Sequence, residues 1–330
     1  MDDSLGMVAL QQGAAFVDAL PLDVIHGTGA DRIAFLHRLL SGKVVGTAEG
    51  SGCHTLLLNL KGHIVSDMQL LVGSDFVRLM VDAGQGQPTA DALNRYAIMD
   101  DFQATPEVGQ RVLCVYGPQA ADLLAVAGAT LPPMVVQGSV FAHGSISFGE
   151  REGWVTKVTE LGGTAFRVGL PKVAAALLSE ALSKAGGVAL SPTAVESLRV
   201  ASGDLKFGVE ITIDRFPMEL GLDDAIDYQK GCYLGQEPII RIRDRGHVNW
   251  RVARLRFAAD GPKIAAGDKL ESDERPAAGH VTSVAYLPAI GSDSAIGAAL
   301  AMVHNTVKAG SVRILTSAGV VSAEVLQLTH

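Results

Sequence analysis

Hydrophobic and polar positions divide the first part of the chain into one helix and three strands. In residues 30–40, apolar residues recur at helical spacing after a glycine-containing turn, which predicts an amphipathic helix. Three strand-like runs follow at residues 53–59, 64–72 and 76–82, and each break between them contains a glycine. These short breaks predict hairpins, and the three strands are therefore expected to form an antiparallel meander.

Helical and strand patterns are then mixed without strict alternation. Further helices are predicted at residues 89–99, 119–127 and 173–184. Further strands are predicted at residues 102–105, 112–116, 154–158 and 165–170. The Pro- and Gly-rich stretch 127–149 indicates a boundary between two α+β units. After Trp250 only short strand patterns remain, at residues 251–257, 280–286, 295–303 and 319–328, which predicts a small all-β terminal domain.

Length and charge favour a globular protein of more than one domain. A chain of 330 residues suits two or three domains, and its 19% charged residues are ordinary for a globular protein. The net charge of −8 is spread along the chain, so direct nucleic-acid binding is not expected. Three features predict a cytoplasmic protein without a membrane span. The three cysteines fit no disulfide framework, the N-terminus is acidic, and no long apolar run occurs.

The segment KGCYLGQE at residues 230–237 contains the most distinctive cysteine. Cys232 follows a glycine, and Lys230 is two residues before it, so a nearby cation can lower the pKa of the thiol. The alternative is a small buried hydrophobic residue, which is the commoner fate of a free cysteine. Residue types alone leave both interpretations open.

Three arginines follow this segment at alternate positions. If the chain is extended there, Arg241, Arg243 and Arg245 lie on one side and could hold a polyanion. The alternative is an edge strand whose charges prevent pairing with other strands.

Asp67 stands inside an otherwise apolar run. A carboxylate at such a position is costly unless it is paired within the sheet or faces a ligand pocket, and Asn59 and Lys61 are nearby candidate partners. The histidines lack the spacing of a zinc site, and no complete dinucleotide or P-loop glycine motif occurs. No metal is therefore assigned.

Taken together, KGCYLGQE at residues 230–237 and RIRDRGHVNWR at residues 241–251 resemble the signature of the YgfZ family, whose relatives include the folate-dependent aminomethyltransferase (T-protein) of the glycine cleavage system. Blocks such as TLLLNLKGHIVSDMQLLV and DRFPMELGLD extend the resemblance over nearly the whole chain. The resemblance implies an α+β fold: a three-domain, aminomethyltransferase-like ring of two α+β domains and a C-terminal β-barrel around a central hole for tetrahydrofolate or a related reduced folate. The implied domains are residues 1–50 with 140–245, residues 51–139 and residues 246–330.

The same resemblance implies roles for individual residues. Asp67 matches the acidic catalytic residue of the aminomethyltransferases, whereas Ala201 in LRVASG replaces the glutamate that grips the pterin, and Glu237 is the favoured substitute. Cys232, Asp67 and Lys230 are the implied catalytic residues. The implied folate contacts are Asp67, Asn59, Tyr96, Arg199, Gln236, Glu237 and Arg241.

Three functions follow from these residues. The leading hypothesis is a folate-binding YgfZ-like protein that uses Cys232 to support assembly or repair of iron-sulfur clusters in client proteins, including tRNA-modifying enzymes. The alternative is a folate-dependent one-carbon transferase or demethylase in which Asp67 acts on the folate. A third is a folate-binding interaction module with a structural Cys232.

Overall fold

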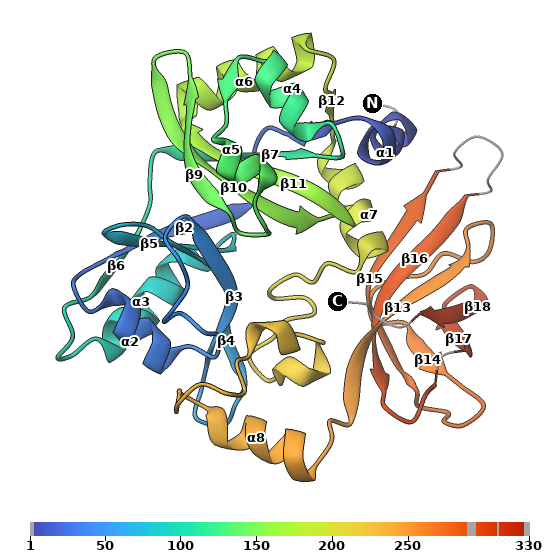
Figure 1. Ribbon diagram of the computed structural model, residues 1–330. Helices are drawn as coiled ribbons and strands as arrows, with labels where there is room; N and C mark the ends of the chain where they lie inside the picture. The colour runs from blue at the N-terminus through green and yellow to red at the C-terminus, as the bar shows by residue number, and fades with distance from the viewer. Residues whose placement is uncertain (1–2, 289–294, 309, 327–330) are drawn as a thin grey trace. The chain divides into compact units, whose positions relative to one another are not determined.

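The computed structural model arranges the chain in two open sheets and one closed barrel (Figure 1). It describes residues 3–288, 295–308 and 310–326. Two compact units are present: a sheet unit of residues 8–190 and 224–238, and a barrel unit of residues 1–7, 191–223 and 239–330. Helix α1 (Asp3–Gln12), the 3-10 turn η2 (Asp223–Ala225) and helix α8 (Gln236–Arg245) each cross from one range to the other.

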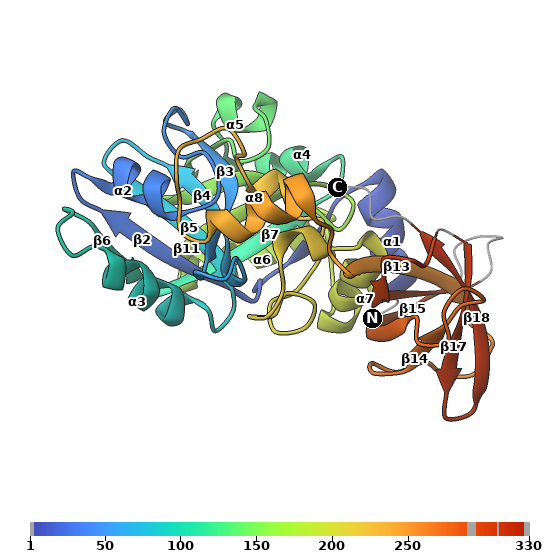
Figure 2. The same ribbon diagram turned by 90° about the horizontal axis from the view of Figure 1, so that it is seen from below.

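The first sheet of the sheet unit has five strands. In order across the sheet they are β3 (Ser51–Leu58), β4 (Ile64–Val72), β5 (Phe76–Asp82), β2 (Leu22–Thr28) and β6 (Gln103–Pro106). The antiparallel pairing of β3, β4 and β5 confirms the predicted meander. Helices α2 (Arg32–Leu39) and α3 (Gly86–Tyr96) lie on one face of this sheet (Figure 2), and Leu36 and Leu93 from these helices belong to its core. Alternation along β4 and β5 sends Asp67, Gln69 and Arg78 to the opposite face.

Helix α3 begins three residues before the predicted start at residue 89. The backbone N–H groups of Gly84 and Gly86 both donate to Asp23 Oδ2, at 2.8 and 2.9 Å. This carboxylate, 63 residues away in sequence, satisfies amides at the start of the helix. A contact between residues so far apart in the sequence cannot be recognised from a local pattern. This explains why the helix begins earlier than its predicted start.

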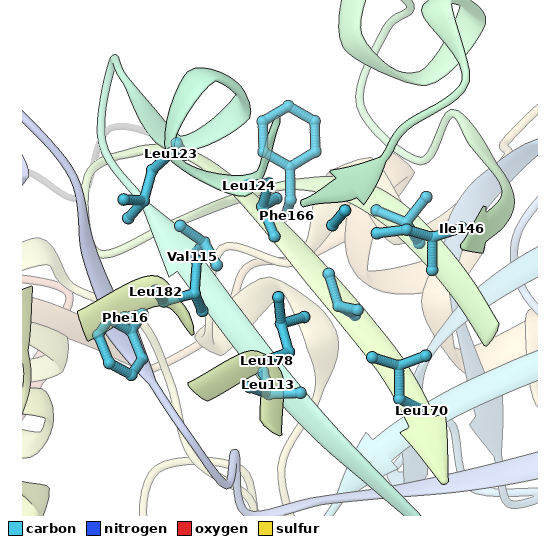
Figure 3. Packing of buried hydrophobic residues seen from close by; sticks show 14 of the residues in the cluster. Phe16, Leu113, Val115, Leu123, Leu124, Ile146, Phe166, Leu170, Leu178 and Leu182 are labelled. Atoms are coloured by element: carbon cyan, nitrogen blue, oxygen red, sulfur yellow. The ribbon is translucent and has the colours of Figure 1, made fainter. Parts of the chain in front are cut away.

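The second sheet has seven strands. Their order is β12 (Val188–Ala189), β1 (Ala15–Val17), β7 (Gln110–Tyr116), β11 (Gly163–Pro171), β10 (Arg151–Glu160), β9 (His143–Phe148) and β8 (Ala129–Thr130). Helices α4 (Ala120–Val126), α5 (Pro133–Gln137) and α6 (Lys172–Lys184) contribute to its core. Figure 3 shows Leu178 and Leu182 of α6 beside Leu113 and Val115 of β7. The predicted helices at 119–127 and 173–184 are confirmed.

The two sheets pack through a small apolar contact. Leu71 and Met80 on the open face of the first sheet meet Val112 and Trp154 of the second. All four side chains are at most 6% exposed. This apolar contact lies on the face of the first sheet that also carries Asp67, Gln69 and Arg78.

The barrel unit contains helix α7 (Pro192–Ser202) and the 3-10 turn η1 (Pro217–Glu219). Ser191 caps α7 by accepting from the N–H of Ala194 at 3.0 Å, and Gly203 ends it at φ 91°. The closed barrel consists of β13 (Trp250–Ala258), β14 (Lys269–Glu271), β15 (Gly279–Leu287), β16 (Ile296–His304), β17 (Gly310–Thr316) and β18 (Gly319–Leu326).

The predicted all-β terminal domain is confirmed as a six-stranded barrel. The sequence patterns missed β14 and β17, and residues 327–328 of the last predicted strand lie outside the described residues. The α+β class is also confirmed. Among the described helices, none combines the length and apolarity needed to cross a membrane.

Candidate functional site

His54 lies between two carboxylates at the edge of the five-stranded sheet. Its Nε2 is 2.5 Å from Asp67 Oδ1, and its Nδ1 is 3.1 Å from Asp224 Oδ2. The register that pairs His54 with Gln69 puts Asp67 at the diagonal position on the neighbouring strand, within reach on the same face. Asp224 comes from the 3-10 turn η2, 170 residues away in sequence. An Asp67–His54–Asp224 cluster therefore joins two distant segments.

The two carboxylates determine the charge of His54. Burial disfavours the imidazolium, but hydrogen bonds and charge attraction from Asp67 and Asp224 outweigh it and raise the pKa of His54 to about 10. With both ring nitrogens facing carboxylates, each donates one hydrogen bond. The cluster thus holds a cationic imidazolium at neutral pH, and Asp67, at 22% side-chain exposure, remains reachable by a ligand.

Asp67 keeps one oxygen for a further partner. Its Oδ1 is bound by His54, while Oδ2 makes no hydrogen bond within the part of the chain that the structure describes. Because an ionised carboxylate accepts several hydrogen bonds, Oδ2 can take a donor from a ligand without breaking the cluster.

The segment 224–238 covers the edge strand β3 and is tied to it by a buried serine. Ser41 Oγ donates to Ala225 O at 2.7 Å and accepts from the N–H of Leu56 at 2.9 Å. The N–H of Asp227 donates to Ser41 O at 3.0 Å. Ser41 is 0% exposed, so these bonds are shielded from water and fix Asp224 beside His54.

Lys230 anchors the same segment to the end of helix α2. Its Nζ donates to the carbonyls of His37, Leu40 and Gly42, at 2.5, 2.6 and 2.8 Å. These are carbonyls at the helix C-terminus, where a cation is favourable. Burial lowers the pKa of Lys230 to about 8, with Asp227 and Cys53 acting in the opposite direction.

A cavity of about 380 Å³ lies along this covered edge. It is lined by Gly42, Lys43, Cys53, His54, Asp224, Ile226, Asp227, Tyr228 and Gln229. Burial raises the pKa of the Cys53 thiol to about 11, although Lys230 acts to lower it, so this thiol is protonated at neutral pH. The polar lining therefore offers carboxylates and an imidazolium, and no thiolate.

A family model for the GCVT N-terminal domain matches residues 6–230. The chain belongs to this family. It is 27% identical over 286 residues to the mitochondrial aminomethyltransferase of Mesembryanthemum crystallinum, covering 82% of this chain and 67% of that one. It is 24% identical over 282 residues to the aminomethyltransferase of Thermosynechococcus vestitus, covering 83% and 73%.

A solved structure has the same fold. The crystal structure of glycine cleavage system aminomethyltransferase T from Bartonella henselae aligns with a TM-score of 0.85 at 23% identity, covering 99% of this chain and 88% of that one. The predicted aminomethyltransferase-like fold is confirmed.

Other residues predicted from the family resemblance have structural partners of their own. Asn59 Oδ1 accepts from the N–H groups of Lys61 and His63, at 2.8 and 3.1 Å, and so holds the hairpin turn between β3 and β4. Tyr96 is the last residue of α3 and is 44% exposed. In this family member, Asn59 therefore positions the hairpin that carries Asp67.

Arg199 lies in the barrel unit within a buried ionic network. It binds Glu196 at 2.8 Å, Glu210 at 3.2 Å and Ser283 Oγ at 2.9 Å. Burial opposes its charge, but Glu196 and Glu210 outweigh burial and raise the pKa of Arg199. Ala201, on the same helix, packs against the apolar cluster of Val200 and Leu300.

The prediction of an extended arginine row was wrong, because residues 236–245 form helix α8. Gln236 begins the helix, Glu237 is the acid in its first turn, and two of the arginines lie in its last turn. Acids at the start and cations at the end suit the helix dipole. At 3.6 residues per turn, Arg241 and Arg245 share a face that Arg243 does not.

Cys232 is exposed, whereas its neighbour Lys230 is directed to the end of α2. His54, Asp224 and Cys53 were not among the site residues predicted from the sequence. The predicted hairpin alone could have indicated a residue of β3 as the partner of Asp67, but His54 is identified only by the observed register, which pairs it with Gln69 and puts Asp67 on the same face. No local pattern points to Asp224.

Proposed function

We propose that the protein binds a reduced folate and transfers a one-carbon unit at the Asp67–His54–Asp224 cluster. The observation that carries the proposal is the position of Asp67, which is bound to a cationic His54 through Oδ1 and keeps Oδ2 for a ligand. The membership in the GCVT N-terminal domain family supports it.

The residues around the cluster fit a folate. The pterin carries several N–H donors, and Asp67 Oδ2 offers an acceptor for one of them. The adjoining cavity of about 380 Å³ is in the usual range of small-molecule sites, roughly 300–1,000 Å³. A bound tetrahydrofolate would supply the ring and side-chain nitrogens that carry the one-carbon unit.

Each residue of the cluster has a separate task in this proposal. Asp67 accepts a hydrogen bond from a folate N–H and takes up its proton as the nitrogen gains the one-carbon unit. His54 orients that carboxylate, and Asp224 holds the imidazole ring from its other side. Asn59, Tyr96, Gln236 and Glu237 remain predicted folate contacts in the sheet unit, and Arg199 and Arg241 in the barrel unit.

The test uses the purified full chain with tetrahydrofolate and an aminomethyl donor such as an S-aminomethyl thioether. The donor carbon is already at the oxidation level of formaldehyde, so ammonia and a free thiol leave as methylenetetrahydrofolate forms and no oxidant is needed. Formation of methylenetetrahydrofolate is expected with wild-type protein, and Asp67→Asn should reduce its rate about a hundredfold or more, since a proton acceptor is lost. Asp75→Asn, in the exposed turn before β5, is the matched control. If the wild-type protein forms no methylenetetrahydrofolate from any donor, or if Asp67→Asn forms it as fast as wild type, the result counts against the proposal.

A second candidate function is the YgfZ-type role in iron-sulfur cluster assembly or repair, with tRNA-modifying enzymes among the clients. The exposed position of Cys232 in KGCYLGQE favours it, because a thiol must be accessible to act on another protein. In cells that depend on this chain, Cys232→Ala should lower the activity of an iron-sulfur enzyme. Unchanged client activity would leave Cys232 with a structural role.

Three further predictions accompany the proposal. The three-domain division at residues 1–50 with 140–245, 51–139 and 246–330 stays a prediction. Catalytic roles for Cys232 and Lys230 stay predictions as well, together with a cytoplasmic location.

A further inference from the structure

A second cavity, of about 630 Å³, opens in the sheet unit between strands β5, β9 and β10. It combines an arginine, two aromatic rings and two carboxylates, namely Arg78, Phe76, Trp154, Glu49 and Glu152. None of these residues takes part in the Asp67–His54–Asp224 cluster. Leu71 pairs with Arg78 and is four residues from Asp67 on the same strand. At the rise of a strand, this separates Arg78 at the cavity from Asp67 in the cluster by about 13 Å.

Arg78 is held in a fixed orientation at this cavity. Its Nε donates to Glu107 Oε1 at 3.1 Å, and its guanidinium carbon lies 5.1 Å from the Phe76 ring centre and 5.0 Å from the Trp154 ring centre. Its two terminal nitrogens donate to no residue within the described ranges, and neither is among the fully buried atoms. A guanidinium fixed in this way presents paired N–H donors that match a carboxylate.

The charges around the cavity disfavour a ligand that is only anionic and a ligand that is only cationic. Glu107 already offsets the charge of Arg78, and Glu49 and Glu152 add two negative charges to the lining. A ligand that is only anionic would be repelled by these two carboxylates. A ligand that is only cationic would leave the terminal nitrogens of Arg78 without an acceptor, and Arg78 already covers one face of the Phe76 ring and one face of the Trp154 ring.

His143 adds no charge to this balance. It is 5% exposed and donates from Nε2 to Val72 O at 3.0 Å. Burial lowers its pKa, which keeps the ring neutral at physiological pH.

We propose that this cavity binds a free amino acid with an apolar side chain. The carboxylate of the ligand binds the terminal nitrogens of Arg78, its ammonium lies at the acidic rim formed by Glu49 and Glu152, and its side chain packs beside Trp154 and Met134. This inference does not depend on folate binding.

The first experiment titrates the full chain with L-leucine, L-methionine and L-phenylalanine, without folate. Trp250→Phe leaves Trp154 as the one tryptophan of the chain, so its fluorescence reports the cavity. At least one amino acid should change this signal saturably. Its decarboxylated amine and its deaminated acid should each bind about tenfold more weakly or worse, since each lacks one charge-assisted contact. No saturable change, or equal binding of either analogue, would overturn the proposal.

Substitutions then assign the contacts. The double variant Glu49→Gln/Glu152→Gln should weaken amino-acid binding about tenfold and leave the deaminated acid unaffected or bound more tightly. Arg78→Lys keeps the charge but loses the paired donors, so it should weaken the amino acid and not the decarboxylated amine. The control is Glu150→Gln/Glu274→Gln, two exposed acids that do not line the cavity. Equal affinity in the double variant and its control would contradict the assigned ammonium site.

Discussion

At the scale of single residues, the position of His54 between Asp67 and Asp224 determines the charge of this cluster. A partly buried imidazole with one carboxylate on each nitrogen is doubly stabilised as a cation, which raises its pKa to about 10. The same contacts fix the orientation of Asp67. The Asp67 carboxylate is tolerated inside an apolar strand because the cationic His54 pairs with it.

We expect Asp67→Asn to lower the pKa of His54 from about 10, because the largest source of its stabilisation as a cation is removed. An NMR titration of the His54 Cε1–H signal measures this pKa directly. Asp75→Asn should leave the signal unchanged. A His54 pKa that stays near its wild-type value in Asp67→Asn would show that Asp224 alone stabilises the imidazolium.

The stability of the protein should depend on pH through the same residue. The folded-state pKa of His54, about 10, is above its ordinary value of 6.5, so its stabilisation is complete below pH 6.5 and is lost as pH rises through 10. The difference in free energy of unfolding between wild type and His54→Gln should therefore shrink between pH 6.5 and 10. Urea unfolding at several pH values measures it, and a difference independent of pH would contradict the assignment.

At the scale of elements, the KGCYLGQE segment covers an edge strand and is held by backbone contacts. Lys230 binds three carbonyls at the end of α2, and Gly235 packs against the turn after β3. The segment thus protects β3 from pairing with another chain. Its lysine and second glycine have structural tasks, whereas Cys232 is exposed.

The two glycines of this segment should respond differently to alanine. Gly235 has φ +77°, and a Cβ there would lie 2.3 Å from Asn59 O, so Gly235→Ala should destabilise the protein by about 2 kcal/mol or more. Gly231 has nothing within 4 Å of an added Cβ, and Gly231→Ala should be close to neutral. Chemical denaturation of both variants measures the two effects. Equal stability would mean that the turn relaxes without cost.

At the scale of the whole molecule, each compact unit has its own core and its own buried polar network. In the barrel unit, Glu210 is 1% exposed and accepts hydrogen bonds from Arg199, Thr282 and Ser283, which joins α7 to strand β15. In the sheet unit, an ion pair between Glu160 and Arg167 lies beside Gln69. Buried charges of this kind are costly when a partner is removed.

Glu210→Gln should therefore destabilise the protein by about 3 kcal/mol, because it leaves the charge of Arg199 without its buried partner. The matched control is Glu324→Gln, which breaks the exposed pair with Arg256 and should cost under about 1 kcal/mol. Thermal and urea unfolding compare the two variants. A loss in Glu210→Gln no larger than in the control would show that Glu196 alone compensates Arg199.

The sequence by itself determined the elements whose cause is local: the meander of β3 to β5, the helices α2, α4 and α6, and four of the six barrel strands. Alternation and helical spacing depend on residues within one element, so they can be recognised without the fold. The helix at 236–245 was missed because alternating arginines fit a strand as well, and only the folded backbone decided between them.

Only the tertiary structure decided the partners of the polar residues. Asp67 stood out in the sequence, but the identity of its partner depends on hairpin register, and Asp224 reaches His54 across 170 residues. Lys230 is two residues from Cys232 in the chain, yet its ammonium is bound by carbonyls of a segment about 190 residues earlier. Local patterns place a side chain on a face of its element, whereas the contacts that set its charge and role form when distant segments pack together.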